Sequence, residues 1–261
     1  MRKSKILARI RAGQPAKIAF MGHFLPPFIA FAADSGYDGI WLDLEHRAME
    51  QREVQALMAF FHLYDLDCMV RPPTREKARL YRYLEDGAAG LMIPHVSDAE
   101  TVRKLTASVK FPPLGDRGIE GKGLEANYGL DLPPSGNRNT FAEHANQETF
   151  LAVQLETPQA VASINEIAAV PGLDGVFIGP ADLALRMQYE KDPQPYRSTL
   201  EKVATAAKAN GIAWGALPRS TEELAEFAAL GAQYWVWGTD IQFLRAGLKQ
   251  AGSELDEILK S

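Results

Sequence analysis

Short apolar runs alternate along this chain with longer stretches in which apolar residues recur at helical spacing. The apolar runs predict eight strands, at residues 17–22, 37–45, 67–71, 90–95, 150–156, 175–180, 212–217 and 233–238. Most are apolar on both faces, as in parallel strands that helices cover on both sides. Eight strand-then-helix units in 261 residues predict an α/β fold, a (β/α)8 TIM barrel, as a single domain over residues 1–261.

An N-terminal helix, an extended last helix and one long segment distinguish this chain from a plain repeat of such units. The basic start MRKSKILARIRAG predicts a short N-terminal helix with Ile6, Leu7 and Ile10 on one face, and residues 241–260 predict an extended C-terminal helix. Residues 111–149 contain the Gly- and Pro-rich stretches PPLGDRGIEGKG and PPSGN, so we expect an irregular segment there. It should wrap the outside of the barrel and reach the mouth or a neighbouring subunit.

Polar side chains stand where several of the predicted strands end. In parallel barrels the active site lies at the carboxyl ends of the strands, so these positions are the informative ones. They comprise Asp43 and His46 after the second strand, Arg71 after the third, Gln154 and Glu156 on the fifth, and Asp182 after the sixth. The sequence therefore predicts that these groups meet at one mouth.

Glu156 and Asp182 follow successive strands, so their carboxylates should lie side by side. Carboxylate oxygens are the ligands that a hard divalent cation prefers. Each residue also has an ordinary structural explanation. Asp182 could cap a helix, and Glu156 precedes Thr157 and Pro158, a normal helix start. The two residues together favour a metal site.

A base and an oxyanion-binding group complete the predicted site. Asp43 lies three residues before His46 and could orient its imidazole for general base catalysis. Arg71 could bind an oxyanion, or it could pair with Glu45 or Glu85 in a structural salt bridge. With a metal, these groups are the parts needed to form an enolate beside a 2-oxo acid.

Further groups could seat the substrate. Gln154 shares a strand face with Glu156, although it could simply fill the barrel. The backbone N–H groups of residues 179–182 open a helix, which is a favourable place for a carboxylate. A Schiff-base aldolase would need a lysine inside the barrel, but Lys17, at the wrong end of the first strand, is the only lysine on the predicted strands.

Composition narrows the class of protein. The formal net charge is -5 and no basic run is present, which argues against nucleic acid as a partner. The single cysteine, Cys68, allows no intrachain disulfide. The basic start lacks the apolar core of a signal peptide, and no apolar run is long enough to span a membrane. We expect a cytoplasmic enzyme with a small-molecule substrate.

Six motifs spread over nearly the whole chain resemble those of the HpcH/HpaI aldolase family: WLDLEH, VRPP, GAAGLMIPHV, PPLGDRG, VQLETPQAV and DGVFIGPADL. VQLET followed by FIGPADL is the most specific. The resemblance implies a metal-dependent class II aldolase that acts through a pyruvate enolate. The family includes 4-hydroxy-2-oxoheptanedioate, 2-dehydro-3-deoxyglucarate and 2-keto-3-deoxyrhamnonate aldolases. The resemblance also implies a homo-oligomer, usually a hexamer, with the last helix packed on a neighbouring subunit.

The resemblance assigns roles to individual residues. It implies that Glu156 and Asp182 bind a divalent metal, commonly Mg²⁺, Mn²⁺ or Co²⁺. His46, paired with Asp43, would serve acid–base catalysis, and Arg71 would steady the enolate. The remaining substrate contacts that we expect are Gln154, Gly179, Pro180, Ala181 and Leu217.

Two stretches depart from the pattern of the family. Within residues 117–128, Glu125 stands about where relatives often have arginine, in a segment that tends to meet the distal end of the substrate. We therefore expect a neutral or hydroxylated aldehyde half rather than one with a distal carboxylate. Residues 184–187 read Ala-Leu-Arg-Met where relatives often have serine and glycine, so the edge of the pocket should differ.

On this hypothesis the metal chelates the carboxylate and 2-oxo oxygen of a 4-hydroxy-2-oxo acid. His46, through water, takes the proton of the 4-hydroxyl, and the C3–C4 bond breaks to give pyruvate and an aldehyde. Three alternatives stay open. One is a lyase of the malyl- or citramalyl-CoA type, for which no basic nucleotide site is evident. The others are an oxaloacetate decarboxylase with the same site and a catalytically silent barrel.

Overall fold

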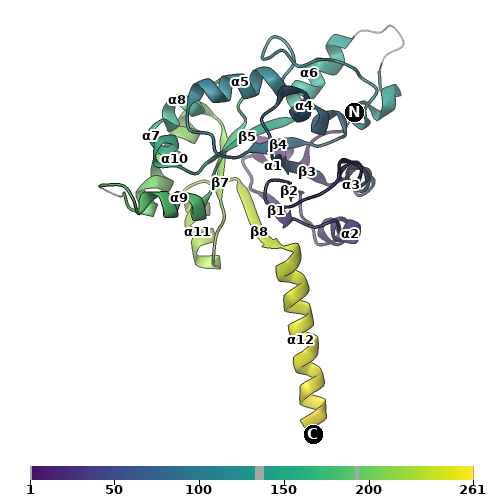
Figure 1. Cartoon of the computed structure of the whole chain (residues 1–261), viewed down its shortest axis with the longest axis vertical. Helices are drawn as coiled ribbons and strands as arrows, with labels where there is room; N and C mark the ends of the chain where they lie inside the picture. Colours follow the sequence, from purple (N-terminus) through teal and green to yellow (C-terminus); the bar gives the residue numbers. More distant parts are fainter. Residues whose placement is uncertain (1, 133–137, 192–193, 261) are drawn as a thin grey trace.

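Eight parallel strands close into a barrel in which each strand pairs with its neighbours in chain order (Figure 1). The computed structural model describes residues 2–132, 138–191 and 194–260. The strands are β1 (Ala16–Met21), β2 (Gly39–Asp43), β3 (Asp67–Arg71), β4 (Gly90–Ile93), β5 (Phe150–Leu155), β6 (Gly175–Ile178), β7 (Ala213–Ala216) and β8 (Tyr234–Thr239). β1 pairs with β8, and this closes the ring. The predicted TIM barrel is confirmed.

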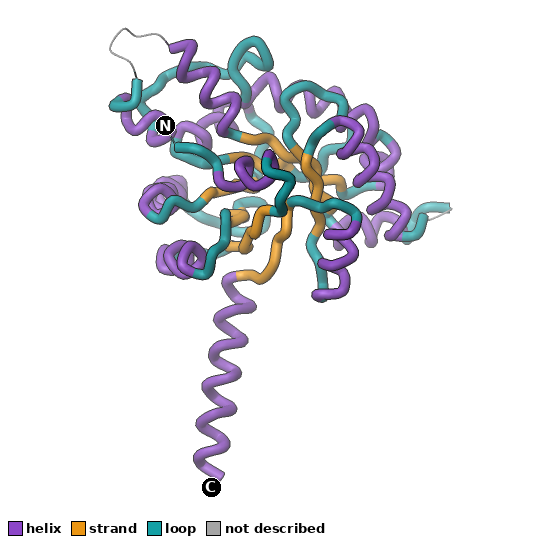
Figure 2. The backbone as a smooth tube through the Cα atoms, turned by 180° about the vertical axis from the view of Figure 1, so that it is seen from behind, coloured by secondary structure: helices purple, strands orange, loops and turns teal. Residues whose placement is uncertain are grey.

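Helices form the outer layer, as Figure 2 shows from behind. They are α2 (Pro26–Asp34), α3 (Gln51–Leu63), α4 (Lys77–Glu85), α5 (Ala99–Val109), α7 (Pro158–Ala162), α8 (Ile164–Ala168), α9 (Pro180–Met187), α10 (Tyr196–Asn210) and α11 (Thr221–Ala229). The apolar faces of these helices and the outward residues of the strands form one continuous core. Several predicted strands are one or two residues too long at their carboxyl ends, because the chain leaves the sheet there.

Large side chains fill the barrel interior. Trp41, Phe177 and Tyr234 belong to this inner cluster, and Trp41 meets the edge of Phe177 with 5.1 Å between ring centroids. Glycine makes room for them: a Cβ at Gly175 would lie 2.5 Å from the Tyr234 ring. The barrel is therefore packed through, and only its carboxyl end can hold a substrate.

The N-terminal helix α1 (Lys5–Arg11) covers the amino end of the barrel. Ile6 and Leu7 are buried against the inner cluster, with Ile10 partly buried beside them, as predicted. Asp67, at the start of β3, is fully buried and fixes the start of the helix. Its carboxylate accepts hydrogen bonds from Ser4 Oγ at 2.6 Å and from the N–H of Ile6 at 2.9 Å.

The segment between β4 and β5 is more ordered than predicted. It contains a 3-10 turn, η1 (Leu124–Gly129), and a helix, α6 (Arg138–Glu148), whose apolar residues pack on Phe111. The expectation of a wholly irregular segment is therefore wrong for these residues. The stretch PPSGN, residues 133–137, lies outside the described residues.

The C-terminal helix α12 (Asp240–Lys260) extends away from the barrel (Figures 1 and 2). Asp240 is its only buried residue. Apolar side chains exposed along the helix are Ile241, Phe243, Leu244, Leu248, Leu255, Ile258 and Leu259. Among the described residues, no helix is both long enough and apolar enough to cross a membrane.

Candidate active site

Arg71 is the centre of the site at the carboxyl end of the barrel. It ends β3 directly beside Asp43 on β2, and its Nε donates to Asp43 Oδ1 at 2.8 Å. Its Nη1 lies 3.2 Å from Glu45 Oε2 and donates to Gln154 Oε1 at 3.4 Å. The guanidinium lies 4.9 Å from the centre of the Trp41 ring. Arg71 is thus held from three sides, and three of the predicted site residues meet here.

His46 stands at the rim, with 58% of its side chain exposed. Its imidazole Nε2 lies 3.6 Å from Glu45 Oε2. Asp43 does not reach the ring but accepts the backbone N–H of Glu45 at 3.1 Å and that of His46 at 3.5 Å. Because Arg71 already binds the Asp43 carboxylate, Asp43 positions the His46 backbone, and Glu45 is the carboxylate nearest to the imidazole.

His95 joins two carboxylates across the mouth. Its Nδ1 lies 2.7 Å from Glu156 Oε2, and its Nε2 lies 2.9 Å from Glu45 Oε1. The backbone of His95 has a φ of 56°, in the left-handed region, and its N–H also donates to Glu156 Oε2 at 3.0 Å. Arg75 donates to the carbonyl oxygens of Pro94 and His95 and so holds this turn.

Glu156 follows β5 and is almost completely buried. Burial raises the pKa of this carboxyl group, and the negative charges of Glu45 and Asp182 add to the effect, while His95 opposes it. Gly179 leaves the space that the carboxylate occupies, since a Cβ there would lie 2.6 Å from Glu156 Cγ. A cation close to Glu156 would therefore relieve an unfavourable concentration of negative charge.

Asp182 lies in the first turn of α9, the helix that follows β6. Its Oδ1 accepts from Arg186 Nη1 at 2.7 Å, and the same nitrogen donates to the carbonyl oxygen of Glu156 at 3.0 Å. Arg186 thus connects the segments that carry the two predicted metal ligands. This arginine belongs to residues 184–187, where we expected the edge of the pocket to differ from relatives.

The predicted substrate contacts follow or end strands of the same barrel. Gln154 is buried on β5, Gly179 is the N-cap of α9, and Pro180 and Ala181 form its first turn. Leu217 follows β7 and packs against the inner cluster of the barrel. Their roles as contacts remain predictions.

The donor set suits a hard divalent cation. Glu156 and Asp182 offer carboxylate oxygens, which Mg²⁺ and Mn²⁺ prefer. Glu45 Oε2 is buried and, apart from its ion-pair contact with Arg71, makes no hydrogen bond within the described residues. The same residues contain no group of three or more His, Cys, Asp or Glu side chains arranged to hold a metal. Glu156 and Asp182 would be the ligands from the protein, with the other positions left to water and substrate.

Glu125 lies far from this mouth. It forms a buried ion pair with Arg117 at 2.6 Å, and Arg117 stacks 4.5 Å above the ring of Phe111. The neighbouring Leu124 packs against Gly87, which precedes β4 at the amino end of the barrel. Among the described residues, Glu125 therefore does not face the distal end of a substrate at this mouth.

Several residues of the mouth were given no firm role from the sequence. His95 and Glu45 could be noticed only as polar residues near strand ends. A second pair, His23 and Asp240, links the carboxyl ends of the neighbouring strands β1 and β8. His23 Nδ1 lies 2.9 Å from Asp240 Oδ2, and that oxygen also accepts the N–H groups of Gly22 and His23. No sequence spacing links residues 217 positions apart.

A closed parallel barrel with buried carboxylates, an arginine and histidines at its carboxyl end defines a TIM-barrel enzyme of acid–base and cation-assisted chemistry. Comparison with known proteins agrees with this class. A family model described as HpcH/HpaI aldolase/citrate lyase matches residues 18–246. The chain belongs to this family, as its motifs indicated.

Individual relatives match over nearly the full chain. A hydroxypyruvate/pyruvate aldolase of Sagittula stellata is 35% identical over 247 residues, covering 93% of this chain and 94% of that protein. A 4-hydroxy-2-oxo-heptane-1,7-dioate aldolase of Salmonella heidelberg is 28% identical, covering 91% of this chain and 89% of that protein. The crystal structure of an HpcH/HpaI aldolase from Desulfitobacterium hafniense is similar with a TM-score of 0.85 and 29% identity, over 96% of each chain.

Proposed function

We propose that this protein is a divalent-metal-dependent aldolase that cleaves or forms 4-hydroxy-2-oxo acids through a pyruvate enolate. The observation that carries the proposal is the placement of Glu156 and Asp182 after successive strands, both tied to Arg186. Relatives named as pyruvate aldolases support the same reaction class.

In the proposed reaction, different residues bind the oxyanion, transfer the proton and hold the carboxylate of the substrate. Arg71, fixed by Asp43 and by its position over Trp41, binds the developing oxyanion without reorganising. His46, exposed at the rim, takes the proton from the 4-hydroxyl group when the C3–C4 bond breaks and returns a proton in the reverse direction. The backbone N–H groups of Ala181 and Asp182, in the first turn of α9, would bind the carboxylate of the pyruvate half.

Glu156 and Asp182 would hold the metal. When bound, a divalent cation supplies a Lewis acid that lowers the energy of negative charge on the 2-oxo oxygen. We name Mg²⁺, Mn²⁺ and Co²⁺ as candidates because the ligands are oxygens.

The test is pyruvate release from a panel of 4-hydroxy-2-oxo acids, measured with coupled lactate dehydrogenase in Mn²⁺ or Mg²⁺ and again in excess EDTA. We expect release that depends on metal, stops with EDTA and is abolished by Glu156→Gln and Asp182→Asn. Asp116→Asn serves as the control, because Asp116 is an exposed carboxylate with its only described partner in Lys77. Full activity in EDTA would refute the scheme.

The same panel addresses the alternatives. Oxaloacetate in the panel separates decarboxylation from aldol cleavage, which use the same residues. Metal binding without release from any substrate would favour a CoA-ester lyase or a silent barrel.

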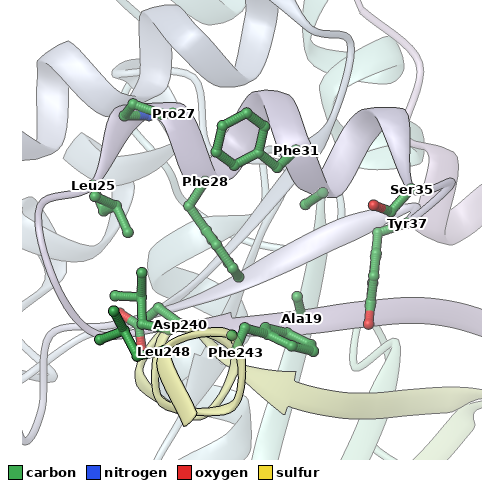
Figure 3. Close-up of a pocket in the computed structure, with 13 residues that line it drawn as sticks. Ala19, Leu25, Pro27, Phe28, Phe31, Ser35, Tyr37, Asp240, Phe243 and Leu248 are labelled. Carbon is green, nitrogen blue, oxygen red and sulfur yellow. The ribbon is translucent and has the colours of Figure 1, made fainter. Parts of the chain in front are cut away.

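We also propose that α12 packs on a neighbouring subunit in a homo-oligomer, with a hexamer as the expected state. A groove of about 630 Å³ lies between α2 and the first half of α12. Figure 3 shows Phe28, Phe31, Phe243 and Leu248 around it. This apolar groove matches the apolar face of α12 beyond Leu248, which no other part of the described chain covers. A second copy of the helix is the occupant that we propose.

A further inference from the structure

A second groove, separate from the apolar one, opens beside the mouth between α3 and α4. Leu44 and Pro73, which follow β2 and β3, lie in its wall, so it belongs to the carboxyl end of the barrel. Its volume is about 480 Å³. Three arginines line it, Arg47, Arg79 and Arg82, and no carboxylate does. The lining thus carries an excess of positive charge in a chain whose formal net charge is -5.

These arginines are poorly neutralised by the protein itself. Arg47 makes no ion pair among the described residues; its Nη1 donates to the carbonyl oxygen of His46 at 2.8 Å. Arg79 lies 3.8 Å from Glu76 with 74% of its side chain exposed, and Arg82 lies 3.5 Å from Glu85. Such exposed contacts within one helix contribute little energy. The three guanidinium groups can therefore turn towards a ligand at low cost.

Arg47 connects the groove to the catalytic residues. It directly follows His46, and its side chain lies over Gly22 at the end of β1, where a Cβ would come within 2.9 Å of Arg47 Cγ. In the proposed reaction His46 acts at the 4-hydroxyl group, whose oxygen becomes the carbonyl oxygen of the aldehyde product. An aldehyde half that begins beside His46 would therefore lie close to Arg47, which also lines the groove.

We propose that this groove binds an anionic group, a carboxylate or a phosphate, at the far end of the aldehyde half. Guanidinium groups bind both anions through paired hydrogen bonds. The side chains of Leu44, Met49 and Tyr83 offer an apolar wall to the connecting carbon chain. The inference rests on the proposed aldolase function. The sequence argument against a distal anion depended on Glu125, which is buried with Arg117 at the other end of the barrel.

The test compares aldol addition of pyruvate, with saturating Mn²⁺, to three aldehydes. Succinic semialdehyde carries a carboxylate, glyceraldehyde 3-phosphate carries a phosphate, and butanal is neutral. The variants are Arg47→Met, Arg79→Met and Arg82→Met, which keep an apolar side chain and remove the charge. Arg197→Met is the matched control, since Arg197 lies on α10 and pairs with Glu201 and Glu226.

We expect the ratio of kcat/KM for the preferred anionic aldehyde to that for butanal to fall about tenfold in Arg47→Met, as for loss of one charge-assisted hydrogen bond. Arg79→Met and Arg82→Met should lower it as well, and Arg197→Met should leave it unchanged. Which anionic aldehyde shows the effect identifies the anion. An unchanged ratio in all three groove variants, with butanal still consumed, overturns the groove while the aldolase function stands.

If none of the three aldehydes reacts, the proposed function is refuted, and with it the role of the groove in binding aldol substrates. A binding measurement then tests whether the groove binds anions at all. Calorimetric titration with succinate and with inorganic phosphate then tests the anion site itself. Binding by the wild-type protein that Arg47→Met abolishes supports the site, and the absence of binding overturns it.

Discussion

At the scale of the residue, each carboxylate of the mouth already has a cationic or ionisable partner within the protein. Asp43 binds Arg71, Glu156 binds His95, and Asp182 binds Arg186, at 2.7 to 2.8 Å. A metal that uses Glu156 and Asp182 has to replace two of these contacts. The affinity for the metal therefore depends on His95 and Arg186 as well as on the two carboxylates.

Arg186 gives the first prediction at this scale. Arg186→Ser removes the cation from Asp182 and from the carbonyl oxygen of Glu156, so Mn²⁺ should bind more tightly. Because the Arg186–Asp182 pair is partly exposed, we expect a gain of roughly twofold to fivefold in affinity. Calorimetric titration of the metal-free protein measures it.

Arg197→Ser is the control for this change, because Arg197 pairs with acidic residues on the outer helices. Unchanged or weaker Mn²⁺ binding in Arg186→Ser would show that the arginine supports the site instead of competing with the metal.

The sequence indicated some residues of the site and not others, for a physical reason. Asp43, Arg71 and Gln154 meet as expected because parallel strands bring their carboxyl ends together. The position of His95 depends on a left-handed backbone conformation, which a non-glycine residue seldom adopts and which no local pattern announces. The contact of Asp43 with the His46 backbone, in place of the ring, follows from competition with Arg71, which is a tertiary effect.

At the scale of the element, α1 depends on one buried carboxylate. Asp67 binds Ser4 and the backbone of Ile6, and Arg2 Nη1 lies 2.6 Å from it. Asp67→Ala leaves these donors without a partner in a buried place. We expect the free energy of unfolding to fall by about 3 to 5 kcal/mol, measured by urea denaturation.

Asp65→Ala is the matched control for this prediction. Asp65 also pairs with Arg2, but 62% of its side chain is exposed. Its loss should cost about 1 kcal/mol or less. Equal losses in the two variants would mean that α1 contributes to stability by apolar burial alone.

At the scale of the whole molecule, the repeating pattern of apolar strands and amphipathic helices was sufficient to predict the barrel. It was not sufficient for the segment between β4 and β5. The helix α6 has a weak pattern, since only Phe141 and Ala145 are buried on it. The position of the segment depends on the buried pair of Arg117 and Glu125 and on the packing of Leu124 against Gly87. Leu124 and Gly87 are far apart in the sequence, so no local pattern predicts their contact.

The proposed assembly gives a prediction at this scale. Leu248→Glu with Leu255→Glu places two charges on the apolar face of α12 and should lower the molar mass measured by light scattering after size-exclusion chromatography. Ser253→Glu adds a charge to the polar face of the same helix and should leave the mass unchanged. Retention of the wild-type mass in the double variant would rule out α12 as the assembly element.

Asp240 gives α12 a further consequence. This buried carboxylate is the first residue of the helix, and it holds the backbone of Gly22 and His23 at the rim of the mouth. Beyond it, the helix extends for roughly 30 Å as a lever. The helix meets the β1–β8 seam through Asp240 and through Phe243, whose ring packs over Gly238 of β8. A subunit bound to α12 would therefore also restrain the backbone of Gly22 and His23. Assembly and the mobility of that side of the mouth are linked in this way.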